Sequence, residues 1–419
     1  MTSTLPQSQV DPAPPRGSPA PPGERSRLGP LEMAYGAAVI QTVLYNPVIA
    51  SRGTLQIYLN TMVWPVVAAA ALVRWARTKD VVLKRALKAT SVATAVLLWV
   101  VLLQIGLGPR EPYAVGNLLR LLYVPMALAA GLAVYRSSRR LLDVSLLAVG
   151  LKCLLMIMPL LKGPIDLVHR LTVPELGGHN TFAAFLVLLV VLRASTWVLA
   201  DDRPPKLVIA SMAVCVAAIF LTFSRGAFLA LAAGVAAFLV MAVLRSRRPG
   251  RAAKAALLLI IVMSPLVVAE PIQSRLSPAS LGQSSGRDEI WQPAWRGFLA
   301  RPLVGHGFGS FEAYSSTIVD LTDPTVVGGV TYSAHSLPLQ VLYEGGLLGL
   351  LLLVSGVTLV LRATWNRVIG PVVVAFVVDS FFETFPHVVQ VSWILGLILA
   401  ISLLHRSAVP RASTPRYWP

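Results

Sequence analysis

Apolar runs, each close to the length that crosses a bilayer, recur along most of the 419-residue chain and constrain its fold more than any other feature. An α-helix needs about 20 mostly apolar residues to span the hydrocarbon core of a membrane. The sequence therefore predicts an all-α, polytopic membrane protein with about twelve transmembrane helices. The runs lie at residues 31–51, 54–73, 89–107, 118–135, 141–161, 180–199, 207–223, 227–244, 255–269, 336–361, 368–386 and 388–404.

The composition agrees with this prediction and excludes several other classes of protein. Apolar residues make up 55% of the chain and charged residues 13%, whereas soluble proteins carry about 25% charged residues. Both cysteines, Cys153 and Cys215, lie inside apolar runs, so neither a disulfide framework nor a metal cluster is expected. The net charge of +17 lies mainly in short loops, which indicates membrane orientation and contact with membrane lipids rather than a nucleic-acid partner.

The distribution of positive charge predicts how the chain is oriented in the membrane. With the N-terminus inside, the cytoplasmic segments carry 24 of the 36 Lys and Arg residues, the external segments nine and the spans three. Short loops rich in Lys and Arg stay preferentially in the cytoplasm. We therefore expect a multi-pass protein of the cytoplasmic (inner) membrane. A disordered tail at residues 1–30 and a second tail at 405–419 should both be cytoplasmic.

This orientation predicts opposite accessibility for two positions outside the spans. A cysteine introduced at Gln283 should react with a membrane-impermeant thiol reagent on intact cells, because this position faces the exterior. A cysteine at Ser407 should react only after permeabilisation. Labelling of the parent protein is the control, and labelling at Ser407 with protection at Gln283 would contradict the orientation.

One long segment interrupts the alternation of spans and short loops. Residues 270–335 form an external loop between nine spans in 31–269 and three spans in 336–404. Because Pro293 lies within this loop, we expect a kinked helix or two short ones, with an aromatic face at the membrane surface or over the bundle. The residues at helical spacing that predict this helix are Trp291, Trp295, Phe298 and Leu299.

Ionisable residues gather at the external ends of the predicted spans. Such side chains are costly to bury in a membrane and often mark functional sites. Asp379 and Glu383, four residues apart, should share one face of the eleventh span. The other candidates lie in external turns, at the start of the loop helix or at the start of a span, and are Arg120, Arg225, Arg287, His335 and Glu344.

Each candidate also has a purely structural explanation that the sequence leaves open. An arginine in a short turn, such as Arg225, often anchors a helix at the membrane interface. A histidine at a helix start, such as His335, is often only a hydrogen-bonding residue. The remaining alternatives are ion pairs, of Arg287 with Asp288 or Glu289, and of Asp379 or Glu383 with Lys152 or Arg193.

Three blocks of sequence carry a recognisable pattern. The first is a Ser-Arg-Gly turn within residues 222–227, and the second runs from Gly286 to a Pro-Leu-x-Gly-x-Gly segment at 302–307. The third extends over 335–349, with Ser336 after the histidine. In this order the blocks resemble the O-antigen ligase and O-antigen polymerase family of integral-membrane glycan transferases, which commonly has Asn at that position. A further similar segment lies at 178–183, and the resemblance covers about residues 175–350.

The resemblance implies a reaction and roles for the candidate residues. Such enzymes take a glycan linked through diphosphate to a polyprenyl lipid and transfer it to a hydroxyl of a glycan, lipid or protein acceptor. Arginine can grip phosphate oxygens in a bidentate manner, and a histidine can take a proton from a hydroxyl. His335 is therefore the expected general base. The expected substrate-binding residues are Arg225 and Arg287, and further Arg120 and Glu344.

No cofactor and no metal are expected. The external loops contain no Asp-x-Asp motif, and the other histidines of this region lack the spacing of metal ligands. The sequence thus predicts a metal-independent glycosyltransferase acting on the outer face of the membrane. A twelve-span secondary transporter is the competing interpretation, although apparent paired halves are lacking and the charges crowd at one side. A non-catalytic scaffold in envelope assembly is the third.

Overall fold

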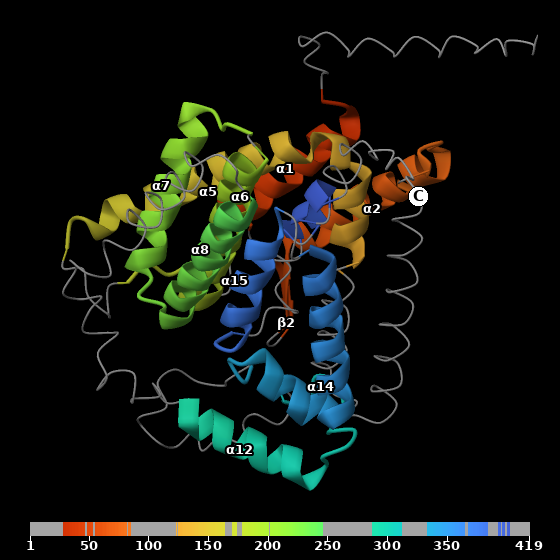
Figure 1. Cartoon of the computed structure of the whole chain (residues 1–419), viewed down its shortest axis with the longest axis vertical. Coiled ribbons are helices and arrows are strands. Elements are labelled where there is room, and N and C mark those ends of the chain that lie inside the picture. The colour runs from red at the N-terminus through yellow and green to blue at the C-terminus, as the bar shows by residue number, and fades with distance from the viewer. Residues whose placement is uncertain are drawn as a thin grey trace, which may run out of the picture.

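The computed structural model is a predominantly helical bundle with one helix lying across its lower end (Figure 1). The described residues are 28–46, 48–52, 55–81, 83–84, 123, 125–163, 170–173, 178–200, 202–245, 287–311, 333–364, 368–383, 393–394, 396–398 and 400–402.

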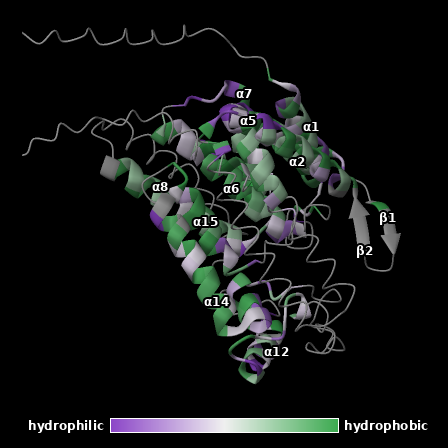
Figure 2. Ribbon diagram, turned by 90° about the vertical axis from the view of Figure 1, so that its right-hand side faces the viewer, coloured by the Kyte–Doolittle hydropathy of each residue, from purple (hydrophilic) through white to green (hydrophobic). Residues whose placement is uncertain are grey.

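The described part of the chain is all-α as predicted, apart from one short hairpin of strands that joins the first two predicted spans. After α1 (Pro30–Leu44), an antiparallel hairpin of β1 (Val48–Arg52) and β2 (Leu55–Tyr58) leads into α2 (Leu59–Arg77). The span predicted at 54–73 therefore begins as a strand. Pro47 gives a reason for the end of α1 at Leu44, because a proline lacks an N–H group and disfavours helix in the residue before it. The hairpin projects from the side of the bundle (Figure 2).

The centre of the bundle is one helix with neighbours on several sides. It is α6 (Gly178–Leu199), whose side chains are mostly buried. A helix that is apolar all round is stable only when it is surrounded. Its neighbours in space are α5 (Ser138–Leu160, preceded by the 3₁₀ turn η1, Tyr135–Ser137), α7 (Lys206–Leu221), α8 (Arg225–Arg245) and α15 (Gly370–Ser380).

Four helices of the described part of the chain are long and apolar enough to cross a membrane. They indicate an integral membrane protein, as predicted. The total of twelve spans and the orientation stay predictions, because the runs at 89–107 and 255–269 lie outside the described residues. The four helices cover Tyr135–Leu160, Gly178–Leu199, Arg225–Val243 and Leu337–Leu359, and the shorter apolar helices are α7 and α15.

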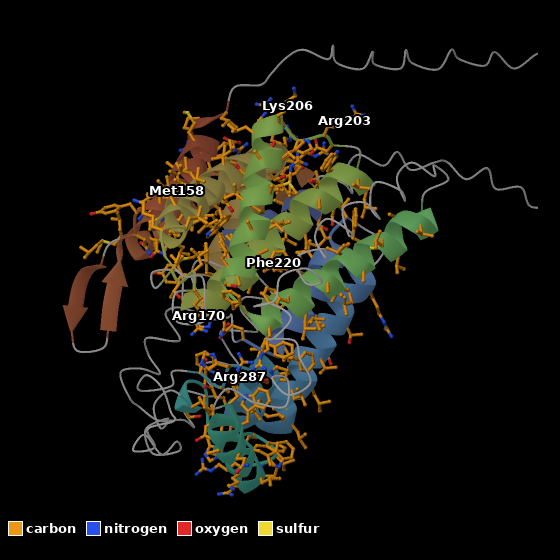
Figure 3. The ribbon with its side chains drawn as sticks, turned by 90° about the vertical axis from the view of Figure 1, so that its left-hand side faces the viewer. Met158, Arg170, Arg203, Lys206, Phe220 and Arg287 are labelled. Carbon is orange, nitrogen blue, oxygen red and sulfur yellow. The ribbon has the colours of Figure 1, made fainter. Side chains whose placement is uncertain are left out.

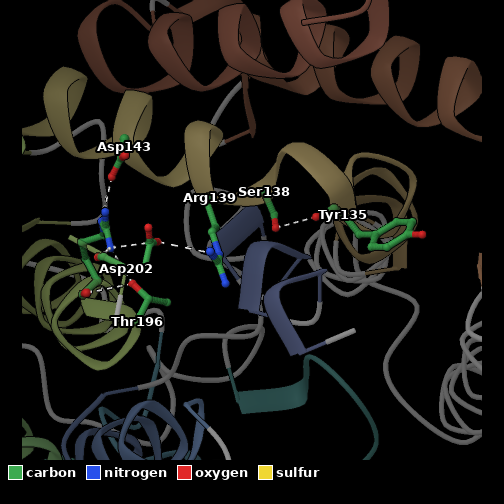
Figure 4. Close-up of polar contacts among 7 residues, drawn as sticks. Tyr135, Ser138, Arg139, Asp143, Thr196 and Asp202 are labelled. Atoms are coloured by element: carbon green, nitrogen blue, oxygen red, sulfur yellow. Dashed lines mark hydrogen bonds and ion pairs between the residues drawn. The ribbon is translucent and has the colours of Figure 1, made fainter. Parts of the chain in front are cut away.

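A buried arginine near the end of α6 has partners other than those considered from the sequence. The Nε atom of Arg193 donates to Asp143 Oδ1 at 2.7 Å, and its Nη1 atom lies 3.3 Å from Asp202 Oδ2 (Figure 4). The alternative that Asp379 or Glu383 serves as its counter-charge is therefore wrong. Arg193 lies near the C-terminal end of α6, far along the helix from Gly178, and Asp143 and Asp202 reach it there.

The loop helix α12 (Arg287–Ala300) is one helix with Pro293 inside it, so of the two predicted alternatives, a kinked helix or two short ones, the second is wrong. Ile290, Ala294 and Phe298 recur every fourth residue and are buried. The first two belong to an apolar cluster with Tyr343 of α14 (Leu337–Thr364). This packing supports the helix on both sides of the proline, whose missing N–H removes one backbone hydrogen bond.

The tenth predicted span is also not one straight helix. α14 contains a break at Gly346, where φ is 60° and ψ is −158°. The part before the break lies across the lower end of the bundle near α12, and the part after it rises beside α15 (Figure 1). His335 therefore precedes the transverse part of α14 rather than opening the span, and Glu344 lies at the end of that part.

Residues 302–307 hydrogen-bond to the backbone of this break, and we call the arrangement the backbone clasp. The amides of His306 and Gly307 donate to the carbonyl oxygens of Tyr343 and Glu344 at 3.0 and 2.9 Å. In the other direction, the amides at positions 347 and 348 donate to the carbonyl oxygens at 302 and 303, at 2.8 and 3.2 Å. The clasp thus satisfies backbone groups that a helix break leaves without partners.

Two glycines make the backbone clasp possible. Gly305 and Gly346 both have positive φ, at 68° and 60°. A Cβ atom at Gly305 would lie 2.5 Å from the backbone of Glu344, and one at Gly346 would lie 2.5 Å from the backbone of Leu303. These contacts give a physical reason for the glycines of the second and third sequence blocks.

Replacing Gly346 by alanine is expected to destabilise the protein by about 1–3 kcal/mol or more, because a non-glycine residue is strained at this φ and its Cβ meets backbone. The thermal unfolding midpoint of the purified protein in detergent measures the effect. Gly356→Ala is the matched control, since Gly356 lies in the same helix with no atom within 4 Å of an added Cβ. Equal midpoints for the two variants would contradict the described backbone clasp.

Candidate active site

The Ser-Arg-Gly turn positions Arg225 at the first residue of α8. Phe223, just before it, has a φ of 52°, which is uncommon for a residue other than glycine and recurs at functional sites. The turn is held by side-chain oxygens. Thr222 Oγ1 accepts from the Ser224 amide at 3.3 Å, and Ser224 Oγ accepts from the Ala227 amide at 3.4 Å.

The end of α15 lies directly against this turn. A Cβ atom at Gly226 would lie 2.6 Å from Phe382 Cβ and 3.3 Å from Asp379 Oδ1. The amide of Glu383 donates to the Asp379 carbonyl at 3.0 Å, so the two carboxylates are one helical turn apart. Both side chains are buried. The turn that carries Arg225 thus lies beside two acidic residues.

Arg287, the first residue of α12, joins the same group of charges. Burial lowers the pKa of the Arg287 guanidinium from its ordinary value; the charge of Glu383 raises it, Arg225 lowers it and Asp379 raises it. A guanidinium remains protonated over the physiological pH range in any case. Glu383, Arg225 and Asp379 therefore all lie close enough to Arg287 for their charges to act on it.

His335 lies next to these carboxylates. Its Nδ1 atom is 3.2 Å from Glu383 Oε1, and its side chain is 35% exposed whereas that of Glu383 is 7% exposed. If Nδ1 carries the hydrogen and donates it to the carboxylate, Nε2 is left with a lone pair and can accept a proton. The backbone of His335 has a φ of 46°, so its conformation depends on the surrounding contacts.

Hydrogen bonds from α12 and α14 hold the residue before the histidine. Trp291 Nε1 donates to the Ala334 carbonyl at 2.9 Å, and the Ala334 amide donates to Gln340 Oε1 at 3.3 Å. Gln340 Nε2 in turn donates to Glu344 Oε1 at 3.2 Å. Glu344, predicted to bind substrate, is buried at the end of this chain of contacts. Its role in binding stays a prediction.

Of the predicted site residues, Arg225, Arg287 and His335 come together at one end of the bundle. Arg120 lies outside the described residues. Arg170 lies at the same end as Arg287, opposite Lys206 (Figure 3). Burial lowers the pKa of Arg170. No role was predicted for Arg170 from the sequence.

Arg170 is tied to the site through the backbone. The Leu171 amide donates to the Leu221 carbonyl at 2.9 Å, and Leu221 ends the helix that leads into the Ser-Arg-Gly turn. An external position was the only signal that the sequence offered for this arginine. Arg170 becomes a candidate site residue because it lies near the Ser-Arg-Gly turn in space, although no motif surrounds it in the sequence.

Residues 210–354 match the family model of O-antigen ligases. The match supports assigning the chain to the O-antigen ligase family. This match agrees with the resemblance found in the sequence. A comparison with curated proteins found no match to the chain. An O-antigen ligase domain supports a general role in glycan transfer and polysaccharide biosynthesis at a membrane, and it does not favour a transporter.

The residues that match the family model contain part of the site. Arg225, Arg287 and His335 lie within the matched residues, whereas Asp379 and Glu383 follow them in the chain. The two carboxylates reach the site because α15 packs against α8. Among the described residues, no three His, Cys, Asp or Glu side chains are gathered as a group that would hold a metal ion.

Proposed function

We propose that this protein moves a saccharide chain from a polyprenyl-diphosphate-linked donor to an acceptor hydroxyl on the outer face of the cytoplasmic membrane. The observation that carries the proposal is the pairing of His335 with Glu383 beside Arg225 and Arg287. The match to the family model of O-antigen ligases, glycan transferases that use lipid-linked glycans, agrees with this proposal.

The two arginines are proposed to bind the diphosphate of the donor. A diphosphate is both the handle by which the lipid-linked glycan is held and the leaving group of the transfer. Its negative charge grows as the bond to the sugar breaks, and fixed guanidinium groups stabilise such charge. The carboxylates of Asp379 and Glu383 balance part of the charge of Arg287.

His335 is proposed to act as the general base. Its Nε2 takes the proton of the acceptor hydroxyl, and the hydroxyl oxygen forms a bond to the anomeric carbon of the donor sugar. The bond from that carbon to the diphosphate oxygen breaks, and its electron pair leaves with the diphosphate. Glu383 holds the imidazole at Nδ1 and stabilises the imidazolium that results.

We propose that this chemistry requires no metal ion. Divalent cations in phosphate-transfer sites neutralise the charge that develops on the leaving oxygens. Here Arg225 and Arg287 supply two fixed positive charges in the same place, and the half-buried Arg170 lies at the same end of the bundle.

Reconstitution separates this function from its competitors. The purified protein in vesicles, given a lipid-diphosphate-linked glycan and a hydroxyl acceptor, should form the transferred product in the presence of a chelator. Product formation without solute uptake supports the proposal. Uptake of solute without product would favour the secondary transporter, and neither activity would favour a scaffold.

Replacing Glu383 by glutamine tests its role as a positioning residue. Glutamine retains an oxygen near Nδ1 but removes the charge that stabilises the imidazolium, so kcat should fall at least about tenfold while KM for the donor changes little. Glu383→Asp should recover part of the rate. Steady-state kinetics at equal amounts of folded protein give the comparison, and an unchanged kcat would exclude the residue from the mechanism.

A further inference from the structure

Four apolar side chains at the lower end of the molecule are exposed, and we call them together the apolar foot (Figure 1). They are Trp295 and Leu299 of α12 and Leu303 and Val304 of the turn that follows, with exposures of 48, 57, 68 and 54%. Large apolar side chains in one exposed patch mark a surface that contacts another apolar phase.

The apolar foot is continuous with the exposed side of a candidate span. The backbone clasp joins Leu348 to Leu303, so the exposed side chains of the turn lie beside those at the start of the rising part of α14. This candidate span buries only 28% of its most apolar window. Figure 2 shows α12 directly below α14. The exposed leucines of α14 are Leu347, Leu348, Leu351, Leu352 and Leu359.

Positive charge borders the apolar foot. Arg296 and Arg301 are exposed, and they follow Trp295 and Ala300 directly. A helix with apolar and aromatic residues on one side and arginine beside them is typical of segments that lie in the plane of a membrane surface. Tryptophan is enriched at the level of the headgroups, and arginine side chains reach lipid phosphates.

We infer that α12 and the turn at 301–304 rest on the phospholipid surface of the leaflet into which α14 rises. The apolar foot enters the boundary between headgroups and acyl chains, and Arg296 and Arg301 contact lipid phosphates. Because Arg287 begins the same helix, this contact sets the height of Arg287 relative to the plane of the headgroups. The inference concerns a lipid-binding surface and does not depend on the transfer reaction.

Two adjacent positions provide a matched test. Leu299 and Ala300 are both exposed, but successive residues of an α-helix point about 100° apart. Single cysteines, Leu299→Cys and Ala300→Cys, are labelled with bimane in the full-length protein and reconstituted in vesicles of phosphatidylcholine and phosphatidylglycerol. Quenching by a lipid with a nitroxide near its headgroup is compared with quenching by aqueous iodide.

The ratio of lipid quenching to iodide quenching should be at least about threefold higher at position 299 than at position 300. Leu303→Cys should behave like Leu299→Cys. Equal iodide access at all three positions would overturn the inference. Shielding of position 299 from both quenchers, with crosslinking between copies, would overturn it in favour of a protein contact.

Discussion

Replacing His335 by alanine is expected to lower the rate of glycan transfer by at least about two orders of magnitude, because a positioned base contributes about 10²–10⁴-fold. Binding of the lipid-diphosphate donor should change little, since Arg225 and Arg287 remain. Single-turnover transfer and a separate donor-binding measurement, both on purified protein, distinguish the two effects.

His306 offers a matched control for this variant. Its ring stacks on Tyr343 with centroids 4.6 Å apart, and its Nε2 atom lies 2.8 Å from the Gly297 carbonyl oxygen. His306→Ala should therefore lower stability while leaving transfer per folded molecule close to the parent value. If His335→Ala transfers at nearly the parent rate, the histidine has no part in the mechanism. If donor binding collapses together with the rate, it is a phosphate ligand.

Replacing Arg225 or Arg287 by alanine should reduce transfer by about 10²–10³-fold, the range typical for losing one fixed donor to a developing negative charge. Lysine at either position should fall between alanine and the parent protein, because it keeps the charge but loses the planar fork that grips two oxygens. Both donor binding and rate should suffer, in contrast to His335→Ala.

Arg203→Ala provides the control for the loss of one positive charge, since Arg203 lies at the opposite end of the bundle from Arg287 (Figure 3). Its transfer rate should match that of the parent protein. Near-normal transfer by both alanine variants at Arg225 and Arg287 would show that these arginines only anchor the protein at the interface. The diphosphate site would then lie elsewhere.

The sequence predicted the residues of the candidate site better than their surroundings. Short motifs indicated Arg225, Arg287 and His335, because those residue types suit the proposed chemistry of a diphosphate and a hydroxyl. Helical spacing of apolar residues in the loop likewise predicted α12. The partnership of His335 with Glu383 joins residues 48 positions apart, and it depends on how α15 packs, which hydropathy does not determine.

The breaks in regular structure were missed for a related reason. The apolar run at 336–361 is continuous, yet α14 breaks at Gly346 because residues some 40 positions earlier supply hydrogen bonds to both sides of the break. The hairpin of β1 and β2 lies at the junction of two predicted spans, 31–51 and 54–73. Counting apolar residues measures the length of a run and not the hydrogen bonds that its backbone makes.

The backbone clasp has a consequence for how the surface of the protein can vary. Leu303 joins α14 through its carbonyl oxygen while its side chain points to the outside. The backbone clasp and the apolar foot therefore use different atoms of Leu303. During evolution, substitutions at Leu303 and Val304 can therefore change the affinity for membranes of different lipid composition. The backbone clasp is kept as long as Gly305 and Gly346 are kept.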